Sequence, residues 1–194
     1  MALYVISGVP ASGKSTVARL LARRLEQAVY VPGDTIRAMV ISGRVNAAAD
    51  GGDAQLHQLQ LRYQATLAVA AVYLNEGYDV VVEDVIIGQV VRHFLAYVPV
   101  HEMHMIFLDP SAAAVAKRDE VRTKTAYGEQ WSARQLRDVL HLETAHIGLW
   151  LDSTDQTAEE TVDQILADPR ASLIVPTQLA APVARRRRRF GPPR

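Results

Sequence analysis

A glycine-rich segment near the start of the chain has the residue types and spacing of a phosphate-binding loop. Residues 8–15 are Gly-Val-Pro-Ala-Ser-Gly-Lys-Ser and match G-x-x-x-x-G-K-[ST] at every fixed position. In such a loop, backbone N–H groups point inward at phosphate oxygens, and the partial positive charge of the next helix N-terminus adds to the attraction. The Lys14 ammonium would reach the β- and γ-phosphates, and the Ser15 hydroxyl would bind Mg²⁺. The sequence therefore predicts binding of ATP and Mg²⁺ through Gly8, Pro10, Ala11, Ser12, Gly13, Lys14, Ser15 and Thr16.

Acidic residues follow two of the expected strands, at the edge where ligands of open α/β folds bind. Asp34 comes just after a short apolar run at residues 29–31. It could accept the proton of an attacking hydroxyl or orient that hydroxyl, and it could also cap the helix that follows. Glu83 and Asp84 end a valine run, and because strand side chains alternate between faces we expect at most one of them to face the site. Asp84 lies further toward the carboxyl edge and is the predicted ligand of Mg²⁺ or substrate, the alternative being a solvated strand end.

A run of bases in the second half of the chain could close over a phosphate. Arg118 and Arg122 are four residues apart and would share one helix face. Residues 126–129, Ala-Tyr-Gly-Glu, interrupt that helix as a hinge would, so we expect a lid over about residues 118–131. Closing the arginines over the phosphoryl group would neutralise developing charge and exclude water, whereas the alternative is a solvated helix face. The predicted catalytic residues are Asp34, Lys14, Arg118 and Arg122.

The elements that must position these residues alternate along the chain. Apolar, β-prone runs stand at residues 3–6, 29–31, 79–85, 103–108 and 147–151. Helical periodicity covers residues 14–27, 34–42, 54–76, 89–97, 111–121, 132–145 and 158–167. Such alternation implies βαβ crossovers and a parallel sheet with helices on both faces. We therefore predict an α/β P-loop NTPase fold of three αβα layers, with five parallel strands in the order 2-3-1-4-5 and a small lid.

Composition limits the class of protein. The chain has 194 residues, of which 49% are hydrophobic and 22% charged, which is typical of one folded domain. The absence of Cys excludes disulfides, thiolate zinc sites, iron–sulfur clusters and thiol catalysis. No apolar run reaches the roughly 18 residues that span a bilayer, and the N-terminus lacks the basic region of a signal peptide. We therefore expect a cytoplasmic monomer or homodimer with no membrane partner.

Charge is unevenly distributed, although 21 Lys+Arg balance 21 Asp+Glu. Six arginines and no acid lie in residues 185–194, and without them 15 bases face 21 acids, a formal charge of −6. We predict a phosphate-loop domain over residues 1–169 and a flexible C-terminal segment over residues 170–194 that ends in this Arg-rich tail. A solvated end is favoured over a nucleic-acid-binding arm, and the acidic body argues against other contact with nucleic acid.

The missing motifs narrow the choice among P-loop proteins. GTPases carry an N-K-x-D segment after a late strand, and this chain has none there. Motor-type and AAA-type ATPases are usually larger and take an arginine from a partner subunit. A small P-loop domain that performs its own chemistry is more often a kinase for a small acceptor. Such a kinase needs an acceptor-binding segment, an acid near the acceptor hydroxyl and mobile cations over the phosphates, and the sequence offers a candidate for each.

Together these motifs resemble the chloramphenicol phosphotransferase-like branch of the small P-loop kinases over roughly residues 3–167. The motifs that carry the resemblance are the phosphate loop, Gly33-Asp34-Thr35, Val80 to Gly88 with its paired acids, and Arg118 to Arg122. The resemblance implies that Asp34 is the catalytic base, that Lys14 and Ser15 serve ATP and Mg²⁺, and that a hydroxyl of a small molecule, an antibiotic or secondary metabolite, is phosphorylated. It also implies an acceptor pocket between the segments after strands two and three, with the candidates Asp34, Arg37, Met39, Val40, Asp84, Ile87 and Gln89.

Other functions stay open. The segment Gly33 to Ala38 is similar to the monophosphate-binding segment of adenylate kinases, in which the Arg contacts the acceptor phosphate. The Gly-[FY]-Pro-Arg segment expected after strand three is missing, however, which ranks a nucleotide or nucleoside kinase second. An RNA 5′-hydroxyl kinase shares the phosphate loop and the acceptor Asp. The non-enzymatic alternative is a nucleotide-binding regulatory module whose Arg-rich tail binds nucleic acid.

Overall fold

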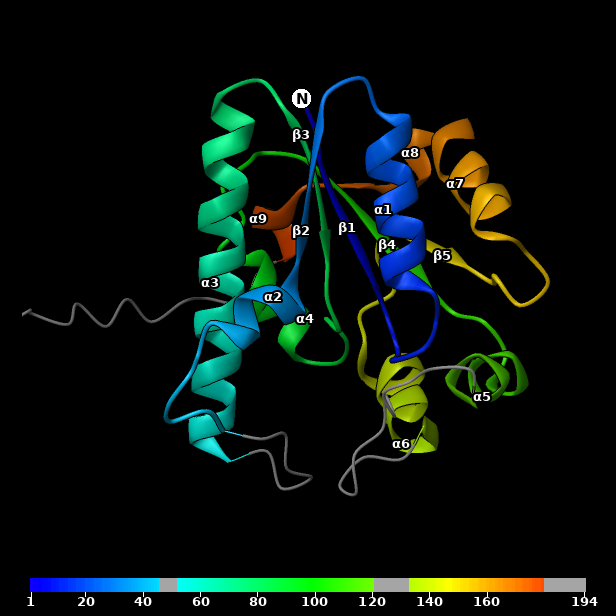
Figure 1. Cartoon of the computed structure of the whole chain (residues 1–194), viewed down its shortest axis with the longest axis horizontal. Helices are drawn as coiled ribbons and strands as arrows, with labels where there is room; N and C mark the ends of the chain where they lie inside the picture. The colour runs from blue at the N-terminus through cyan, green and yellow to red at the C-terminus, as the bar shows by residue number, and fades with distance from the viewer. Residues whose placement is uncertain (46–51, 121–132, 180–194) are drawn as a thin grey trace, which may run out of the picture.

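The computed structural model describes residues 1–45, 52–120 and 133–179, which form one sheet between two layers of helices (Figure 1). Five parallel strands have the order β2-β3-β1-β4-β5, and β6 pairs with β4 in the antiparallel sense. The strands are β1 Leu3–Gly8, β2 Ala28–Pro32, β3 Asp79–Glu83, β4 Met103–Leu108, β5 Leu149–Leu151 and β6 Leu173–Ile174. The helices are α1 Lys14–Arg24, α2 Gly33–Ala38, α3 Asp53–Asn75, α4 Val90–Leu95, α5 Ala112–Glu120, α6 Ala133–Asp138, the π-helical η1 Val139–Glu143, α7 Ala158–Ala167, α8 Pro169–Ser172 and α9 Pro176–Leu179. The predicted order of the five parallel strands is confirmed.

Each face of the sheet packs against its own helices because side chains alternate along the strands. On one face, Ile6 of β1 packs with Leu21 of α1 and Val162 of α7, and all three are fully buried. On the other face, Val5 packs in a second cluster with Phe94 of α4 and with apolar residues of α3. Figure 1 shows the two layers, with α1 and α7 on one side of the sheet and α3 and α4 on the other. The valines at 80–82 are fully buried, as predicted for a central parallel strand covered on both faces.

The carboxyl ends of the parallel strands bring distant segments together. The phosphate loop follows β1, Asp34 follows β2, Asp84 follows β3, and Asp109 follows β4. Because parallel strands end at the same edge, these residues meet at one rim of the sheet. In Figure 1 this is the lower rim, where α2, α5 and α6 also lie. The fold therefore assembles a site from segments more than 100 residues apart.

Several predicted helices are shorter in the structure, and two of them differ most from the prediction. The helix predicted over residues 34–42 is α2 and ends at Ala38. Its end is tightened by bonds of the i→i+3 type, from Met39 N–H to Ile36 O at 3.2 Å and from Val40 N–H to Arg37 O at 3.3 Å, and the chain then leaves the helix. The helix predicted over residues 132–145 divides into α6 and η1, and such π-helical turns occur frequently at functional sites.

The segment after Pro169 is more regular than the sequence pattern predicted. It forms α8, the two-residue strand β6 and α9, and only residues 180–194 of the predicted flexible C-terminal segment lie outside the described residues. A two-residue strand is too short to show a hydrophobic period, so the sixth strand was missed. In the described part of the chain, no helix has both the length and the apolarity to cross a membrane.

Candidate active site

Three residues of the phosphate loop have positive φ. Ala11 has φ 60° and is the one described non-glycine residue in that region, and Gly13 has φ 99°. Ser12 N–H donates to Val9 O at 3.2 Å, and the Gly13 carbonyl accepts the first helical bonds of α1 at 3.1 and 3.0 Å. Gly8 has φ 142°, and a Cβ there would collide with the Leu108 carbonyl oxygen of β4. The loop therefore folds as its glycines predict, with β4 directly behind it.

Two cations at the phosphate loop, Lys14 of the loop and Arg118 of α5, donate hydrogen bonds to backbone carbonyls. Lys14 is 5% exposed, and its Nζ donates to Val9 O at 2.8 Å. Arg118, at the end of α5, donates to Ser12 O of the phosphate loop at 3.1 Å and to Ser153 O, just after β5, at 2.7 Å. The predicted lid arginine Arg118 thus lies against the loop, whereas Arg122 lies outside the described residues.

Asp34 lies in the first turn of α2 and is exposed. The helix starts one residue earlier than predicted, with Pro32 as its N-cap, and no side-chain hydrogen bond caps it. The expected capping role of Asp34 is therefore corrected. Within the described residues no hydrogen bond or ion pair engages the Asp34 carboxylate, which leaves it available to a ligand.

The paired acids at the end of β3 have different partners. Glu83 accepts a hydrogen bond from Tyr30 OH at 3.1 Å, and burial together with the Glu83 charge raises the pKa of Tyr30 to about 12. Asp84 Oδ1 lies 2.9 Å from Arg62 of α3 and accepts the Val85 N–H at 2.7 Å. Asp84 Oδ2 is buried and has no hydrogen-bond partner in the described part of the chain. Burial raises the pKa of Asp84 to about 6, although the Arg62 charge and the Val85 N–H act to lower it.

One cavity of about 1840 Å³ joins the two predicted halves of the site. The phosphate-loop residues from Pro10 to Thr16 border it together with Arg118, whereas Gly8 does not. The predicted acceptor residues also border it: Asp34, Arg37, Met39, Val40, Asp84, Ile87 and Gln89. Glu83 borders it as well, with its carboxylate bonded to Tyr30, and which of the paired acids faces a ligand stays a prediction. Strand alternation holds, but the cavity is wide enough to reach both sides of the β3 end.

Three features of the cavity wall were not found from the sequence. Arg62 comes from the middle of α3, and Val139 and Glu143 come from η1. Gly88 N–H donates to Thr144 Oγ1 at 2.6 Å, and Thr144 Oγ1 donates to Val139 O at 3.1 Å, so η1 is tied to the loop after β3. No local motif surrounds any of these residues, and only the packing of α3 and η1 brings them to the rim.

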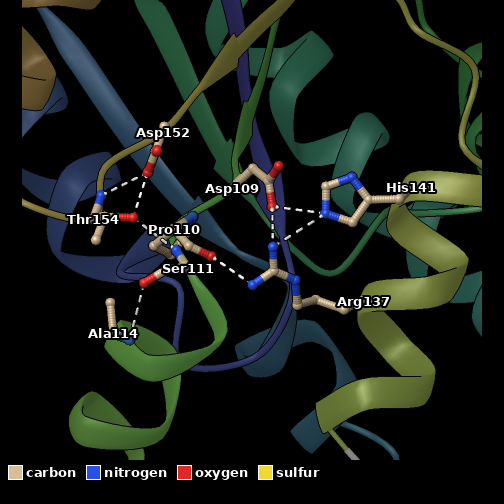
Figure 2. A network of polar contacts seen from close by, with 8 residues as sticks. All are labelled: Asp109, Pro110, Ser111, Ala114, Arg137, His141, Asp152 and Thr154. Carbon is tan, nitrogen blue, oxygen red and sulfur yellow. Dashed lines mark hydrogen bonds and ion pairs between the residues drawn. The ribbon is translucent and has the colours of Figure 1, made fainter.

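A polar network beside the cavity connects the loops after β4 and β5 (Figure 2). Asp109 Oδ1 lies 3.2 Å from His141 Nε2 and 3.9 Å from Arg137, and Arg137 also donates to Pro110 O at 3.4 Å. Ser111 N–H donates to Thr154 Oγ1 at 2.7 Å, and Thr154 in turn bonds Asp152. The hydrogen bonds from Thr154 lower the pKa of Asp152. The network fixes the segment whose Ser153 carbonyl receives Arg118.

The donor set fits a nucleoside triphosphate with Mg²⁺. Glycines let the phosphate loop come close to a ligand, and Lys14 and Arg118 supply positive charge. The Ser15 hydroxyl and the unpartnered Asp84 Oδ2 are the oxygen ligands that Mg²⁺ prefers. Among the described residues no group of three His, Cys, Asp or Glu could hold a metal without further ligands, so Mg²⁺ here would need phosphate oxygens and water.

The strand order and the phosphate loop define a P-loop NTPase fold of the kinase type. More specifically, residues 3–145 match the AAA domain family AAA_33, and the chain belongs to that family. A search of curated proteins found no match to the sequence.

Solved structures with the same fold include several small kinases. A sugar kinase from Janibacter sp. HTCC2649 is 19% identical with a TM-score of 0.61, and the match covers 93% of this chain and 99% of that one. The tunicamycin resistance protein of Deinococcus radiodurans is 15% identical with a TM-score of 0.62, over 93% and 99% of the two chains. The APS kinase of Mycobacterium tuberculosis, in complex with AMPPNP and APS, is 19% identical with a TM-score of 0.60, over 86% and 95%. At these identities the likeness establishes the fold, and the family and the phosphate loop together indicate nucleotide binding.

Proposed function

We propose that the chain is an ATP- and Mg²⁺-dependent phosphotransferase that moves the γ-phosphate to a hydroxyl of a small molecule, an antibiotic or other secondary metabolite. One observation carries the proposal: a single cavity is bordered by the phosphate loop and by the unengaged carboxylate of Asp34. A nucleotide switch needs the loop alone. A kinase also needs an acid facing the space next to the terminal phosphate.

The phosphate loop and its cations would bind and neutralise the phosphates. The Lys14 ammonium would exchange its bond to Val9 O for the β- and γ-phosphate oxygens. Arg118 is already aligned by two carbonyls, so it needs little reorganisation to offset the charge that develops during transfer. When bound, Mg²⁺ supplies positive charge to the β- and γ-phosphate oxygens. Ser15 and Asp84 are the residues that would hold it.

Asp34 would act on the acceptor. Its carboxylate accepts the proton of the acceptor hydroxyl as that oxygen forms its bond to the γ-phosphorus. The bond between the γ-phosphorus and the β–γ bridging oxygen breaks, ADP leaves with that oxygen, and the proton passes from Asp34 to solvent. The products are ADP, a phosphate monoester and one proton.

Two lines of support favour an antibiotic or metabolite as the acceptor. The motifs resemble the chloramphenicol phosphotransferase-like kinases, and the tunicamycin resistance protein shares the fold. The segment after β3 is Val85-Ile86-Ile87-Gly88 rather than the Gly-[FY]-Pro-Arg of nucleotide kinases. The direct test is a Mg-ATP turnover screen across amphenicol, aminoglycoside, nucleoside, peptide-antibiotic and sugar acceptors, with mass spectrometry of the products. A product heavier by one HPO₃ unit supports the proposal, and phosphorylation of nucleotides alone would replace it by the nucleotide-kinase alternative.

Asp34→Asn tests the role of the carboxylate. Loss of the general base is expected to lower the rate of acceptor phosphorylation by about 10²–10⁴-fold while ATP binding stays unchanged. Asp138→Asn is the matched control, because Asp138 is an exposed carboxylate of α6 that does not border the cavity. Single-turnover rates and ATP titrations measure the two effects separately. A wild-type rate in Asp34→Asn would show that Asp34 is not the base.

A further inference from the structure

A buried ion pair lies in the acceptor half of the cavity. Arg62 of α3 and Asp84 after β3 both border the cavity, and their charged atoms are 2.9 Å apart. The Arg62 side chain is 15% exposed and that of Asp84 is 5% exposed. The guanidinium also lies 5.7 Å from the ring centroid of Tyr63, which is itself buried. The pair is therefore fixed in place and shielded from bulk water.

This pairing leaves the deep acceptor region without an uncompensated cation among the described residues. Lys14 and Arg118 are bonded within the phosphate half. Arg37 and Arg44 border the cavity but are exposed side chains at its mouth, where water screens their charge. An anionic acceptor would lose its hydration and find the positive charge of Arg62 already matched by Asp84.

Carboxylates make the same region more unfavourable for an anion. Asp34 and Glu83 border the cavity from α2 and from the end of β3, and Glu143 borders it from η1. Like charges brought close together in a partly desolvated cavity repel, which is how sites reject a wrong partner. A neutral acceptor avoids this repulsion and still offers its hydroxyl to Asp34.

Exposed apolar side chains lie beside Arg37 and Arg44 at the mouth of the acceptor half. Four of the exposed large apolar side chains in the described part of the chain border this cavity: Met39, Val40, Val45 and Leu61. Gln58 of α3 holds the segment that carries Val45, because its side chain donates to Gly43 O at 2.6 Å and accepts from Val45 N–H at 2.9 Å. Exposed apolar side chains gathered around a cavity indicate a ligand that covers them.

We propose that the acceptor is an uncharged alcohol with an apolar body, and that anionic acceptors such as sugar acids and phosphate monoesters are disfavoured because Asp84 neutralises Arg62 and leaves them no cation to bind. This inference rests on the proposed function and names its substrate class. Arg62 acts here through its pairing with Asp84 and is a specificity-determining residue rather than a catalytic one. The deep acceptor region would select by charge. Among the described residues Arg62 is the cation that lies there, and Asp84 neutralises it.

The test uses two pairs of alcohols that differ in one charge. Mandelamide is compared with mandelate, and 3-(hydroxymethyl)benzamide with 3-(hydroxymethyl)benzoate. Each pair shares an aromatic body and a hydroxyl, and a carboxamide in one member replaces the carboxylate of the other. Titration calorimetry on the whole chain without ATP or Mg²⁺ is expected to show amides binding at least about tenfold more tightly than carboxylates. Equal binding, tighter carboxylate binding, or no binding of any probe would overturn the proposal.

Two variants test whether the preference depends on the neutralisation of Arg62 by Asp84. Asp84→Asn leaves Arg62 unpaired, so it is expected to lower the amide-to-carboxylate affinity ratio by about tenfold. The double variant Arg62→Met with Asp84→Asn removes both charges and is expected to keep the ratio within about threefold of wild type. The double variant carries no unpaired buried charge, so it remains informative if the single variant fails to fold. Selective loss of carboxylate binding in the double variant would show that Arg62 binds anions directly, which contradicts the proposal.

The outcomes separate this inference from the proposed function. The binding measurements need no turnover, so they stand even if no acceptor is phosphorylated. Failure of the proposed function appears as the absence of any phosphorylated product in the acceptor screen. Phosphorylation of nucleoside monophosphates that depends on Arg37 would instead preserve a kinase and overturn the charge selectivity argued here.

Discussion

At the residue scale, the phosphate loop depends on Gly8 because the backbone there leaves no room for a side chain. The residue combines φ 142° with a backbone so close to β4 that a Cβ would collide with the Leu108 carbonyl oxygen. Gly8→Ala therefore strains the backbone and pushes β1 away from β4. We expect the free energy of unfolding to fall by about 2 kcal/mol or more, measured by urea denaturation.

Gly52→Ala is the matched control for this prediction. Gly52 precedes α3, its φ is −52°, and a Cβ there meets nothing within 4 Å. Gly52 is the N-cap of α3, where Gly is preferred to Ala, so the control is expected to lower the free energy of unfolding by at most about 1 kcal/mol. Equal stability of the two variants would show that the close approach of β1 and β4 at Gly8 does not constrain the loop.

At the residue scale, what could be predicted depended on whether a residue's role was local. The phosphate loop was recognisable because its glycines, Lys14 and Ser15 act within eight consecutive residues. Asp34 was found because it directly follows a strand. Arg62 was missed because its partner Asp84 lies on another element, and nothing in the sequence around Arg62 indicates which face of α3 meets the end of β3.

At the element scale, a hydrogen bond ties the end of η1 to the loop that carries Ile87 and Gln89. The buried Thr144 accepts the Gly88 N–H, so Thr144→Val leaves that N–H without a partner, at a cost of about 1–3 kcal/mol. We expect the KM for the acceptor to rise several-fold while the KM for ATP stays unchanged. Steady-state kinetics with each substrate varied would measure both constants.

Thr144→Ser separates the hydrogen bond from packing in this prediction. Serine keeps the hydroxyl that receives the Gly88 N–H and donates to Val139 O, so the KM for the acceptor is expected to return close to wild type. A defect in Thr144→Ser as large as that in Thr144→Val would show that the effect does not depend on the hydroxyl, because serine keeps it. Equal effects on the two KM values would show that η1 does not act on the acceptor loop in particular.

The C-terminal elements are attached to β4 through a buried histidine. His104 Nδ1 lies 3.1 Å from Pro169 O and 2.9 Å from Ser172 Oγ, and the ring stacks on Tyr4. Burial lowers the pKa of His104, against the Pro169 carbonyl, Asp79 and Glu102, which raise it. A histidine whose pKa is lower in the folded chain contributes stability above its unfolded pKa of about 6.5 and loses it as the pH falls further.

We therefore expect acid to weaken this attachment. The unfolding temperature should fall between about pH 7.5 and about pH 5, and the fall should be smaller in His104→Gln, whose amide can still donate to Pro169 O. His57→Gln is the control, because His57 is exposed on α3. Thermal unfolding followed by circular dichroism at each pH measures the difference. An identical pH dependence in wild type and His104→Gln would exclude His104 as the titrating group.

The elements that the sequence predicted well are those with a long, clear period. The strand at residues 103–108 and the helix at residues 158–167 have the predicted bounds, and α3 differs by one residue at each end. β6 was missed because two residues show no period, and η1 because a π-turn has the same apolar pattern as the helix it continues. The end of α2 was misplaced because Gly43 looked like the stop, whereas the backbone leaves the helix at Ala38.

At the scale of the whole molecule, neutrality conceals a separation of charge. The body carries a formal −6 and the tail at residues 185–194 carries +6. Within the body, Lys14 and Arg118 place positive charge where the phosphates would bind. The overall charge therefore indicates neither the ligand nor the partner, and the site must be judged from its local charges.

Deleting residues 183–194 tests whether the tail takes part in the function. The deletion removes six arginines and no acid, so the formal charge changes from 0 to −6. The cavity is bordered by residues from 10 to 161, so we expect acceptor turnover to stay within about twofold of the full chain. Any retention of the full chain on heparin or DNA should weaken steeply with salt and disappear in the truncated chain, because it would rest on counterion release by the arginines. If the truncated chain lost nucleic-acid binding and the full chain phosphorylated no acceptor, the regulatory module would be the better description, because the phosphate loop would then serve a switch whose partner is bound by the tail.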